Sequence, residues 1–270
     1  PERPDLMKRL VPLLMASLMT APAHAALPAA PDAAQRAHTV TAPHGASRAD
    51  AYYWMRDDAR TDKDVIGYLN AENAYADAVL APLKPLQEAL YEEIVGRIKQ
   101  DDASVPYLDN GWWYYTRFET GKDYPIHARR EGSMEAAEQV LLDLNPMADG
   151  KGYFSVGDMQ VSPDNRLLAW AEDGVGRRQY TIRFKDLSSG QILDDVIEGA
   201  SPNVVWADDN KTLFYVENDP DTLLTVRVKK HVLGTPASSD VVVYQEDDDS
   251  FYMGIGRTTD DRFITIGVES

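Results

Sequence analysis

The densest set of side chains capable of chemistry is the acidic run Glu246-Asp247-Asp248-Asp249. Neighbouring carboxylates could steer cationic ligands or bind a metal loosely, because their oxygens attract and coordinate cations. A run of like charges is also typical of a solvated connection between strands, and we favour that interpretation. The sequence therefore offers Asp247, Asp248 and Asp249 as candidate substrate-steering residues, and it predicts no metal site.

Motifs that carry a catalytic nucleophile are missing. Gly199-Ala-Ser201-Pro-Asn203 lacks the final glycine of the Gly-x-Ser-x-Gly elbow on which hydrolases expose a serine. The sequence contains no His-Glu-x-x-His zinc pair, phosphate-binding loop or dinucleotide fingerprint. His127 and His231 are isolated, and we interpret both as ordinary half-buried or surface histidines rather than catalytic bases. We therefore assign no catalytic, cofactor-binding or metal-binding residue.

Composition narrows the classes of partner. The chain has 44 acidic and 27 basic residues, which gives a formal net charge of −17. Binding to nucleic acid depends on neutralising phosphates, so nucleic acid is not an expected partner, whereas basic ligands would be attracted. The absence of cysteine excludes disulfides, a cysteine nucleophile and thiolate metal sites.

A repeated turn and strand predicts the architecture. Asp109, Asp164, Asp209 and Asp260 each lie in a turn of Asp, Asn, Pro or Gly residues that precedes an apolar strand, most clearly in the stretch 162–173. The spacing of about 50 residues is typical of β-propellers, which use one four-stranded blade per period. Unrelated hairpins with similar turns are the alternative. We expect a mainly β chain in which residues 105–270 form the first three to four blades of a propeller.

Additional strands are predicted between the repeated turns. Runs of β-branched and aromatic residues between Gly, Asn and Asp turns predict strands. The expected strands cover residues 112–118, 126–131, 139–143, 167–172, 181–186, 213–217, 225–228, 241–244 and 263–268.

The amino-terminal residues have the pattern of an export signal. Lys8 and Arg9 precede an apolar stretch, and Ala23-His24-Ala25 has the small-x-small pattern of a cleavage site. A membrane anchor is the alternative, but the stretch is shorter than the roughly 20 residues that span a bilayer, and Pro12 interrupts it. We expect residues 1–25 to contain a signal peptide cleaved near Ala25, so that the protein is secreted, as a periplasmic protein. Residues 26–49 are expected to form a flexible arm.

Residues 50–104 are expected to form a helical segment. Apolar residues recur at helical spacing after Asp62, a good N-cap, and Pro82 and Pro85 separate a second helix with its own apolar stripe. Such stripes must be buried against something, so we expect the helices to pack on another domain. The adjacent cluster Tyr52-Tyr53-Trp54-Met55 is expected to pack at a domain boundary.

These residues resemble the prolyl oligopeptidase family of serine peptidases, and oligopeptidase B most closely. The resemblance covers about residues 40–270. It rests on the stretch from Asp50 to Asp58, on the helix ending Tyr68-Leu-Asn-Ala-Glu-Asn73, and on the Ser162-Pro-Asp-Asn165 turn. The order of helices followed by blades also matches.

The resemblance implies a two-domain enzyme. A seven-bladed propeller would cover an α/β-hydrolase domain, onto which the amino-terminal helices would pack, and that domain would carry a Ser-His-Asp triad beyond Ser270. The chain would then be a fragment with an incomplete propeller, inactive alone, of a peptidase that cuts short basic peptides after Lys or Arg. The alternative is a non-enzymatic periplasmic propeller that binds a partner protein. No cofactor is implied.

Overall fold

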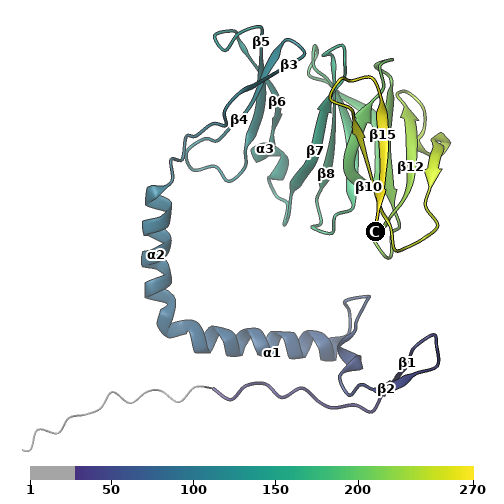
Figure 1. Cartoon of the computed structure of the whole chain (residues 1–270). Coiled ribbons are helices and arrows are strands. Elements are labelled where there is room, and N and C mark those ends of the chain that lie inside the picture. Colours follow the sequence, from purple (N-terminus) through teal and green to yellow (C-terminus); the bar gives the residue numbers. More distant parts are fainter. Residues whose placement is uncertain (1–27) are drawn as a thin grey trace, which may run out of the picture. The chain divides into compact units, whose positions relative to one another are not determined.

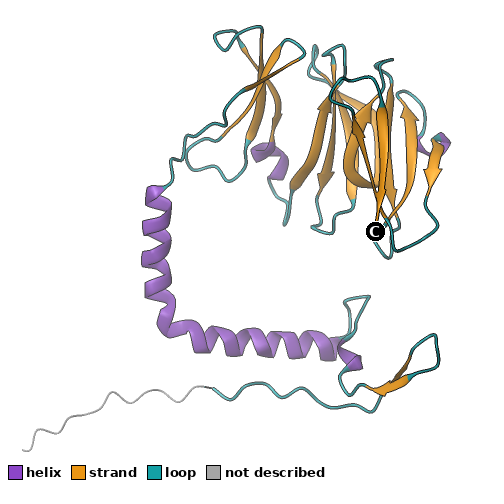
Figure 2. Cartoon of the chain, in the orientation of Figure 1, coloured by secondary structure: helices purple, strands orange, loops and turns teal. Residues whose placement is uncertain are grey.

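A computed structural model describes residues 28–270, so the expected signal peptide lies outside the described residues. The chain divides into two compact units, one ending at Ile98 and the other running from Lys99 to Ser270. Helices characterise the first unit and strands dominate the second (Figure 2).

The first unit begins with a hairpin of β1 (Thr39–Thr41) and β2 (Ser47–Ala49), which falls within the residues expected to form a flexible arm. It continues with the 3₁₀ turn η1 (Tyr53–Met55), α1 (Lys63–Leu80), η2 (Ala81–Leu83) and α2 (Lys84–Arg97) (Figure 1). Asp62 is the N-cap of α1, as predicted, and accepts hydrogen bonds from the backbone N–H groups of Asp64 and Val65. Within the described part of the chain, no helix is long and apolar enough to cross a membrane.

Trp54 anchors the arm to the start of α1. Its indole N–H donates to the Ala34 carbonyl at 2.8 Å, and the Arg36 guanidinium lies 4.3 Å from the centre of its ring. Arg36 also pairs with Asp64 at 2.6 Å. The aromatic cluster therefore packs within the first unit, between the arm and the helix.

The helices leave their apolar stripes uncovered within this unit. Val65 is the buried residue of α1, and no described residue of α2 is buried. Leu86 is 57% exposed and Ile94 is 59% exposed. Burying apolar surface is worth roughly 25 cal/mol per Å², so these stripes are suited to contact with another apolar surface.

The second unit contains the blades. Blade 1 is the antiparallel sheet of β3 (Tyr107–Asp109), β4 (Trp112–Arg117), β5 (Ile126–Glu131) and β6 (Glu138–Asp143), followed by the short helix α3 (Leu144–Ala148). A seven-stranded sheet then comprises β7 (Ser155–Val161), β8 (Leu167–Asp173), β9 (Tyr180–Asp186), β10 (Ile192–Trp206), β11 (Thr212–Asn218), β12 (Thr225–Val232) and β13 (Val241–Gln245). The 3₁₀ turn η3 (Ala237–Ser239) precedes β13, and a hairpin of β14 (Tyr252–Arg257) and β15 (Ile264–Glu269) ends the chain.

The long strand β10 belongs to two blades. Its first part pairs with β9 from Ile192 to Ala200, and its second part pairs with β11 from Ala200 to Trp206. Register irregularities occur on both sides of Ala200, and Gly199 has a φ of 69°, so the strand bends there. Strands β7 to β9 with the first part of β10 form blade 2, and the second part of β10 with β11 to β13 forms blade 3. The β14–β15 hairpin begins a fourth blade. The predicted mainly β propeller is thus the observed fold.

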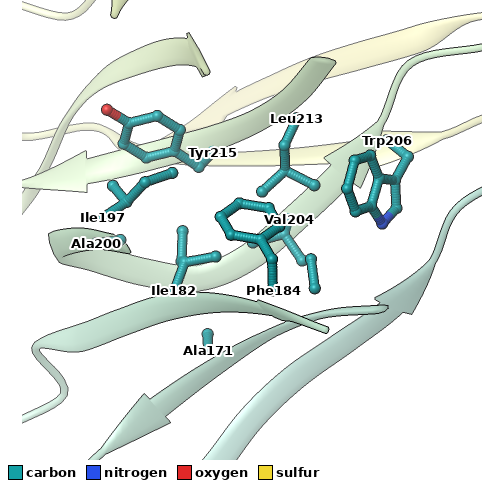
Figure 3. Close-up of a cluster of buried hydrophobic side chains, with 10 residues drawn as sticks. Ala171, Ile182, Phe184, Ile197, Ala200, Val204, Trp206, Leu213 and Tyr215 are labelled. Atoms are coloured by element: carbon teal, nitrogen blue, oxygen red, sulfur yellow. The ribbon is translucent and has the colours of Figure 1, made fainter. Parts of the chain in front are cut away.

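Apolar cores lie between successive blades. One cluster joins blades 2 and 3 through Phe184, Trp206 and Tyr215 among others, and nine of its members are labelled in Figure 3. A second joins blades 1 and 2 around Trp170 and Leu141. A smaller one places Met253 of β14 against Val216 and Val228 of blade 3.

The repeated turns are structurally equivalent. Asn110, Asn165, Asn210 and Asp261 follow the four anchoring aspartates and adopt φ values of 45°, 65°, 57° and 57°. Each residue lies between the first and second strands of its blade, and Asn and Asp are the side chains that best tolerate this left-handed backbone. The Asn165 amide also donates to the Asn110 carbonyl at 3.2 Å. The turns therefore both reverse the chain and connect neighbouring blades.

This geometry predicts the effect of substituting Asn165. Asn165→Ala should lower the free energy of unfolding by about 1–3 kcal/mol, because it strains the left-handed backbone and removes the bond to blade 1. Asn165→Gly loses the same bond without the strain, so it should be about 1 kcal/mol more stable than the alanine variant. Urea unfolding of the three proteins measures both differences. Equal stability of the alanine and glycine variants would contradict the strain argument.

Candidate functional site at the inner strands

The first strand of each blade faces a cavity of about 770 Å³. Most of the cavity wall comes from β3, β7, the second part of β10, and β14, with their following turns, and β4, β6 and β8 add Tyr114, Leu141 and Leu168. Its polar lining residues are Asp109, Asn110, Asp158, Gln160, Ser162, Asn165, Asn203, Asp208, Arg257 and Asp261.

Asp158 lies at the junction of the inner strands of blades 2 and 3. Its carboxylate accepts a hydrogen bond from the Met159 N–H at 2.8 Å and another from the Val204 N–H at 3.4 Å. Burial raises the pKa of Asp158, although these two backbone groups oppose the rise. Among the described residues Asp158 has no cationic partner, so its negative charge is available to a ligand in the cavity.

Arg257 is neutralised by its own neighbours. Its guanidinium pairs with Asp208 and with Asp261, the latter at 3.4 Å, and donates to the Trp206 carbonyl at 3.0 Å. Asp109, like Asp158, has no ion pair among residues 28–270. Because one arginine meets four aspartates in the lining, the cavity surface carries net negative charge. Such a surface suits cationic groups such as Lys and Arg side chains.

The acidic run predicted as a steering site lies elsewhere. Residues 246–251 connect β13 to β14, and none of them lines the cavity. Asp248 accepts bonds from the Ser250 hydroxyl at 2.7 Å and the Ser250 N–H at 2.9 Å, and these lower its pKa. Asp247 accepts a bond from the Gln245 amide at 2.7 Å. The described residues contain no cluster of His, Cys, Asp or Glu side chains fit to hold a metal ion. The run is thus an exposed, internally hydrogen-bonded connection.

Sequence reasoning named the turn residues around Asp109, Asp208 and Asp261 but missed Asp158 and Arg257. Both precede a repeated turn on the inner strand of a blade, Asp158 before Ser162 and Arg257 before Asp260. Counting backwards from each turn along the preceding strand would have identified them. The isolated His127 is half-buried and contacts the Thr116 hydroxyl at 3.1 Å, and burial lowers its pKa.

Comparison with known proteins places this fold in a family. The model of the prolyl oligopeptidase N-terminal β-propeller domain matches residues 31–270. Dipeptidyl aminopeptidase BI of Pseudoxanthomonas mexicana is 60% identical over 96% of this chain and 38% of its own length. Protease 2 of Moraxella lacunata is 33% identical over 83% of this chain and 33% of its own length.

The solved structures that this chain resembles belong to the same kind of peptidase. Oligopeptidase B from Leishmania major is 35% identical with a TM-score of 0.85, covering 89% of this chain and 36% of that one. Oligopeptidase B from Trypanosoma brucei is 30% identical with a TM-score of 0.81, and the match covers 88% of this chain and 35% of that one. The chain thus spans little more than a third of the length of the relatives it matches. It belongs to the prolyl oligopeptidase family of serine peptidases, in the region of the family's amino-terminal β-propeller.

Proposed function

We propose that this chain forms the propeller and amino-terminal helices of a serine oligopeptidase that hydrolyses short peptides after Lys or Arg. In this proposal the propeller limits access to a Ser-His-Asp triad on an α/β-hydrolase domain of the same protein, located after residue 270. The observation that carries the substrate preference is the acidic cavity, in which Asp109 and Asp158 have no ion pair among the described residues. The exposed apolar stripes of α1 and α2 support the second domain, since they need an apolar surface to cover them.

The peptide preference is tested on the complete protein. We expect kcat/KM for peptide amides with Arg or Lys before the cleaved bond to exceed that for Pro by about tenfold or more. Residues 1–270 expressed alone should give no hydrolysis, because we assign no nucleophile to them. A preference for Pro would refute the basic specificity, and turnover by residues 1–270 would refute the position of the triad.

The contribution of the acidic charge to substrate attraction is tested by varying the salt concentration. Attraction between an acidic propeller and cationic peptides is screened beyond about 8 Å at physiological ionic strength, so kcat/KM should fall as salt rises. The fall should be smaller after Asp109→Asn with Asp158→Asn, and smaller also after Asn substitution of Asp247, Asp248 and Asp249. Comparing the salt dependence of the two variants shows how much of the attraction comes from the cavity carboxylates and how much from those of the connecting loop. A salt response unchanged in both would show that neither group of carboxylates steers the substrate.

A second candidate activity is release of dipeptides from the amino ends of peptides. It is favoured by the 60% identity to a protein named dipeptidyl aminopeptidase. Peptides with free and blocked amino termini distinguish the two activities, because an enzyme that recognises the amino end should reject the blocked peptides.

The comparisons do not favour a non-enzymatic binding module, since these relatives are named as peptidases.

We also propose that the protein is exported to the periplasm. The support is the Lys8-Arg9 pair, the apolar stretch and Ala23-His24-Ala25. Mature protein should begin between Ala26 and Pro28 on amino-terminal sequencing of the periplasmic fraction. Mature protein that still contains Met7 would contradict cleavage.

A further inference from the structure

The outer strand of blade 3 ends its sheet with an unpaired edge. Strand β13 pairs with β12 on one side and is the last strand of the seven-stranded sheet. The first strands of the blades face the cavity, so β13, the fourth strand of blade 3, lies at the outer rim. A neighbouring blade would pack against a face of β13 and would leave this edge open.

The backbone at this edge can bond to another strand. The Glu246 N–H, directly after β13, donates to the Val226 carbonyl of β12 at 3.1 Å. Backbone groups of successive residues point to opposite sides of an antiparallel strand, so the N–H and C=O of Gln245 point to the free edge. These groups form the start of a hydrogen-bonding ladder that an added strand would complete.

Strand β13 lacks the charges that protect the other outer strands. Exposed strand edges attract foreign strands unless charged side chains, proline or short length prevent it. The outer strand of blade 1 carries Glu138, and that of blade 2 carries Asp194 and Asp195. The sequence of β13 is Val-Val-Val-Tyr-Gln, without a charge, and its Val241 and Val243 are 55% and 47% exposed. Its β-branched and aromatic composition suits pairing with a further strand.

Negative charge lies at the carboxyl end of β13. The acidic run 246–249 follows the strand directly, and among the described residues it has no ion pair. Two cations of β12, Arg227 and Lys229, both pair with Glu217 instead. Lys230 lies opposite the first residue of β13, at the end away from the run. A strand docked on β13 would therefore meet unneutralised carboxylates at one end.

Charge decides which strand fits this edge. Two copies of β13 paired in parallel would place one acidic run beside the other, and an antiparallel pair centred on Val243 would place each run opposite Asp240 of the other copy. Like charges opposite one another are destabilising, and the net charge of −17 adds to the repulsion between copies. An extended peptide that carries Lys or Arg would bring opposite charge to the run. The observations therefore favour a basic peptide over a second copy of the chain.

We propose that β13 and residues 246–249 form a binding edge for an extended basic peptide. The peptide backbone adds to the free edge of β13, and its Lys or Arg side chains lie beside the acidic run. None of these residues lines the cavity, so the binding edge is separate from it. Binding at this edge does not depend on the peptidase activity proposed above and can be measured without turnover.

The test is binding of labelled peptides to the complete protein, measured by fluorescence anisotropy. The protein is first treated with a sulfonyl fluoride, which blocks a catalytic serine and so protects the peptide from cleavage. The probe is a peptide of two lysines followed by alternating valine and threonine. One matched peptide has two glutamates in place of the lysines, and another carries methyl groups on its valine and threonine backbone nitrogens, which then cannot donate hydrogen bonds.

The lysine peptide should bind about tenfold more tightly than either matched peptide, because one lacks the charge attraction and the other lacks the backbone bonds. Asp247→Asn with Asp249→Asn should weaken its binding about threefold or more. Asp194→Asn with Glu198→Gln removes two exposed charges from the outer strand of blade 2 and should leave the binding unchanged. Equal binding of the three peptides, or equal weakening in the two double variants, would overturn the proposal.

A second pair of variants locates the binding on β13. Val243→Lys places a charge on the strand, which is how natural edges prevent strand addition, so it should weaken binding of the lysine peptide about tenfold or more. Val175→Lys adds the same charge at a 74% exposed position between β8 and β9 and should bind as the wild type does. Equal affinity in these two variants would also overturn the proposal. So would self-association that Val243→Lys abolishes in a protein that binds no peptide, since the occupant of the edge would then be a second copy.

Discussion

Replacing Trp206 with alanine is expected to lower the free energy of unfolding by about 3–5 kcal/mol. Trp206 is 3% exposed, lies in the second part of β10, and contacts Phe184 edge-to-face at a centroid distance of 5.9 Å. Its indole N–H donates to the Gln160 carbonyl of β7 at 2.9 Å. Alanine would therefore leave a cavity in the apolar cluster between blades 2 and 3 (Figure 3), and it would also remove the hydrogen bond between their inner strands.

Trp206→Phe separates these two contributions. Phenylalanine fills most of the volume but cannot donate to Gln160, so this variant should lose only about 1–3 kcal/mol. Urea unfolding or calorimetry gives both values. A loss below about 1 kcal/mol for Trp206→Ala would mean that the blades close around the missing ring.

The second large effect is expected at Arg129. This guanidinium is buried in blade 1, stacks 3.8 Å from the centre of the Trp112 ring, and has neutral hydrogen-bond partners. It donates to the Gln139 side-chain oxygen at 2.7 Å and to the Asn165 carbonyl of the blade 2 turn at 2.7 Å. Arg129→Ala should cost about 3–5 kcal/mol, because it leaves these buried acceptors without a donor and removes packing from Trp112.

Arg129→Lys is the matched control. Lysine retains the positive charge but lacks the planar fork that reaches several acceptors at once, so it should recover only part of the lost stability. Full recovery with lysine would show that charge rather than bidentate geometry holds the two blades together. An alanine variant within about 1 kcal/mol of wild type would show that water replaces the guanidinium.

The sequence predicted the second and third strands of the blades well and the inner strands poorly. Expected strands at residues 126–131 and 181–186 appear as β5 (Ile126–Glu131) and β9 (Tyr180–Asp186). In the second unit, strands β3, β7, β10 and β14 were not predicted, and apart from the first part of β10, which is the outer strand of blade 2, these are inner strands. Inner strands face the cavity, so they carry polar or small residues such as Gly157, Asp158 and Gly254 in place of β-branched ones.

The prediction of the candidate site was incomplete because its residues lie far apart in the sequence. A cavity wall is assembled from residues about 50 positions apart, and only the fold brings Asp158, Asn203 and Arg257 to the same cavity. The acidic run Glu246–Asp249 is conspicuous in sequence because its charges are consecutive, which is a property of a solvated connection. His231 is likewise isolated in sequence, but it is fully buried rather than half-buried or on the surface, and the fold brings it to Asp240 at 2.8 Å and to Asp195 at 3.2 Å.

The shared strand β10 has a mechanical consequence. Blades 2 and 3 are joined by a continuous hydrogen-bonded ladder, whereas blade 1 is attached to blade 2 by a connecting segment and side-chain contacts such as Lys185 to the Leu141 carbonyl. A force that pulls on the two ends of residues 99–270 should therefore detach blade 1 and the β14–β15 hairpin first, because each is a separate sheet, and extend blades 2 and 3 together in a later, larger step. Single-molecule extension would record that order, and a simultaneous release of all three blades would exclude it. A pulling force on the propeller would therefore pass between blades 2 and 3 through the bend at Gly199, where β10 runs from one blade into the next.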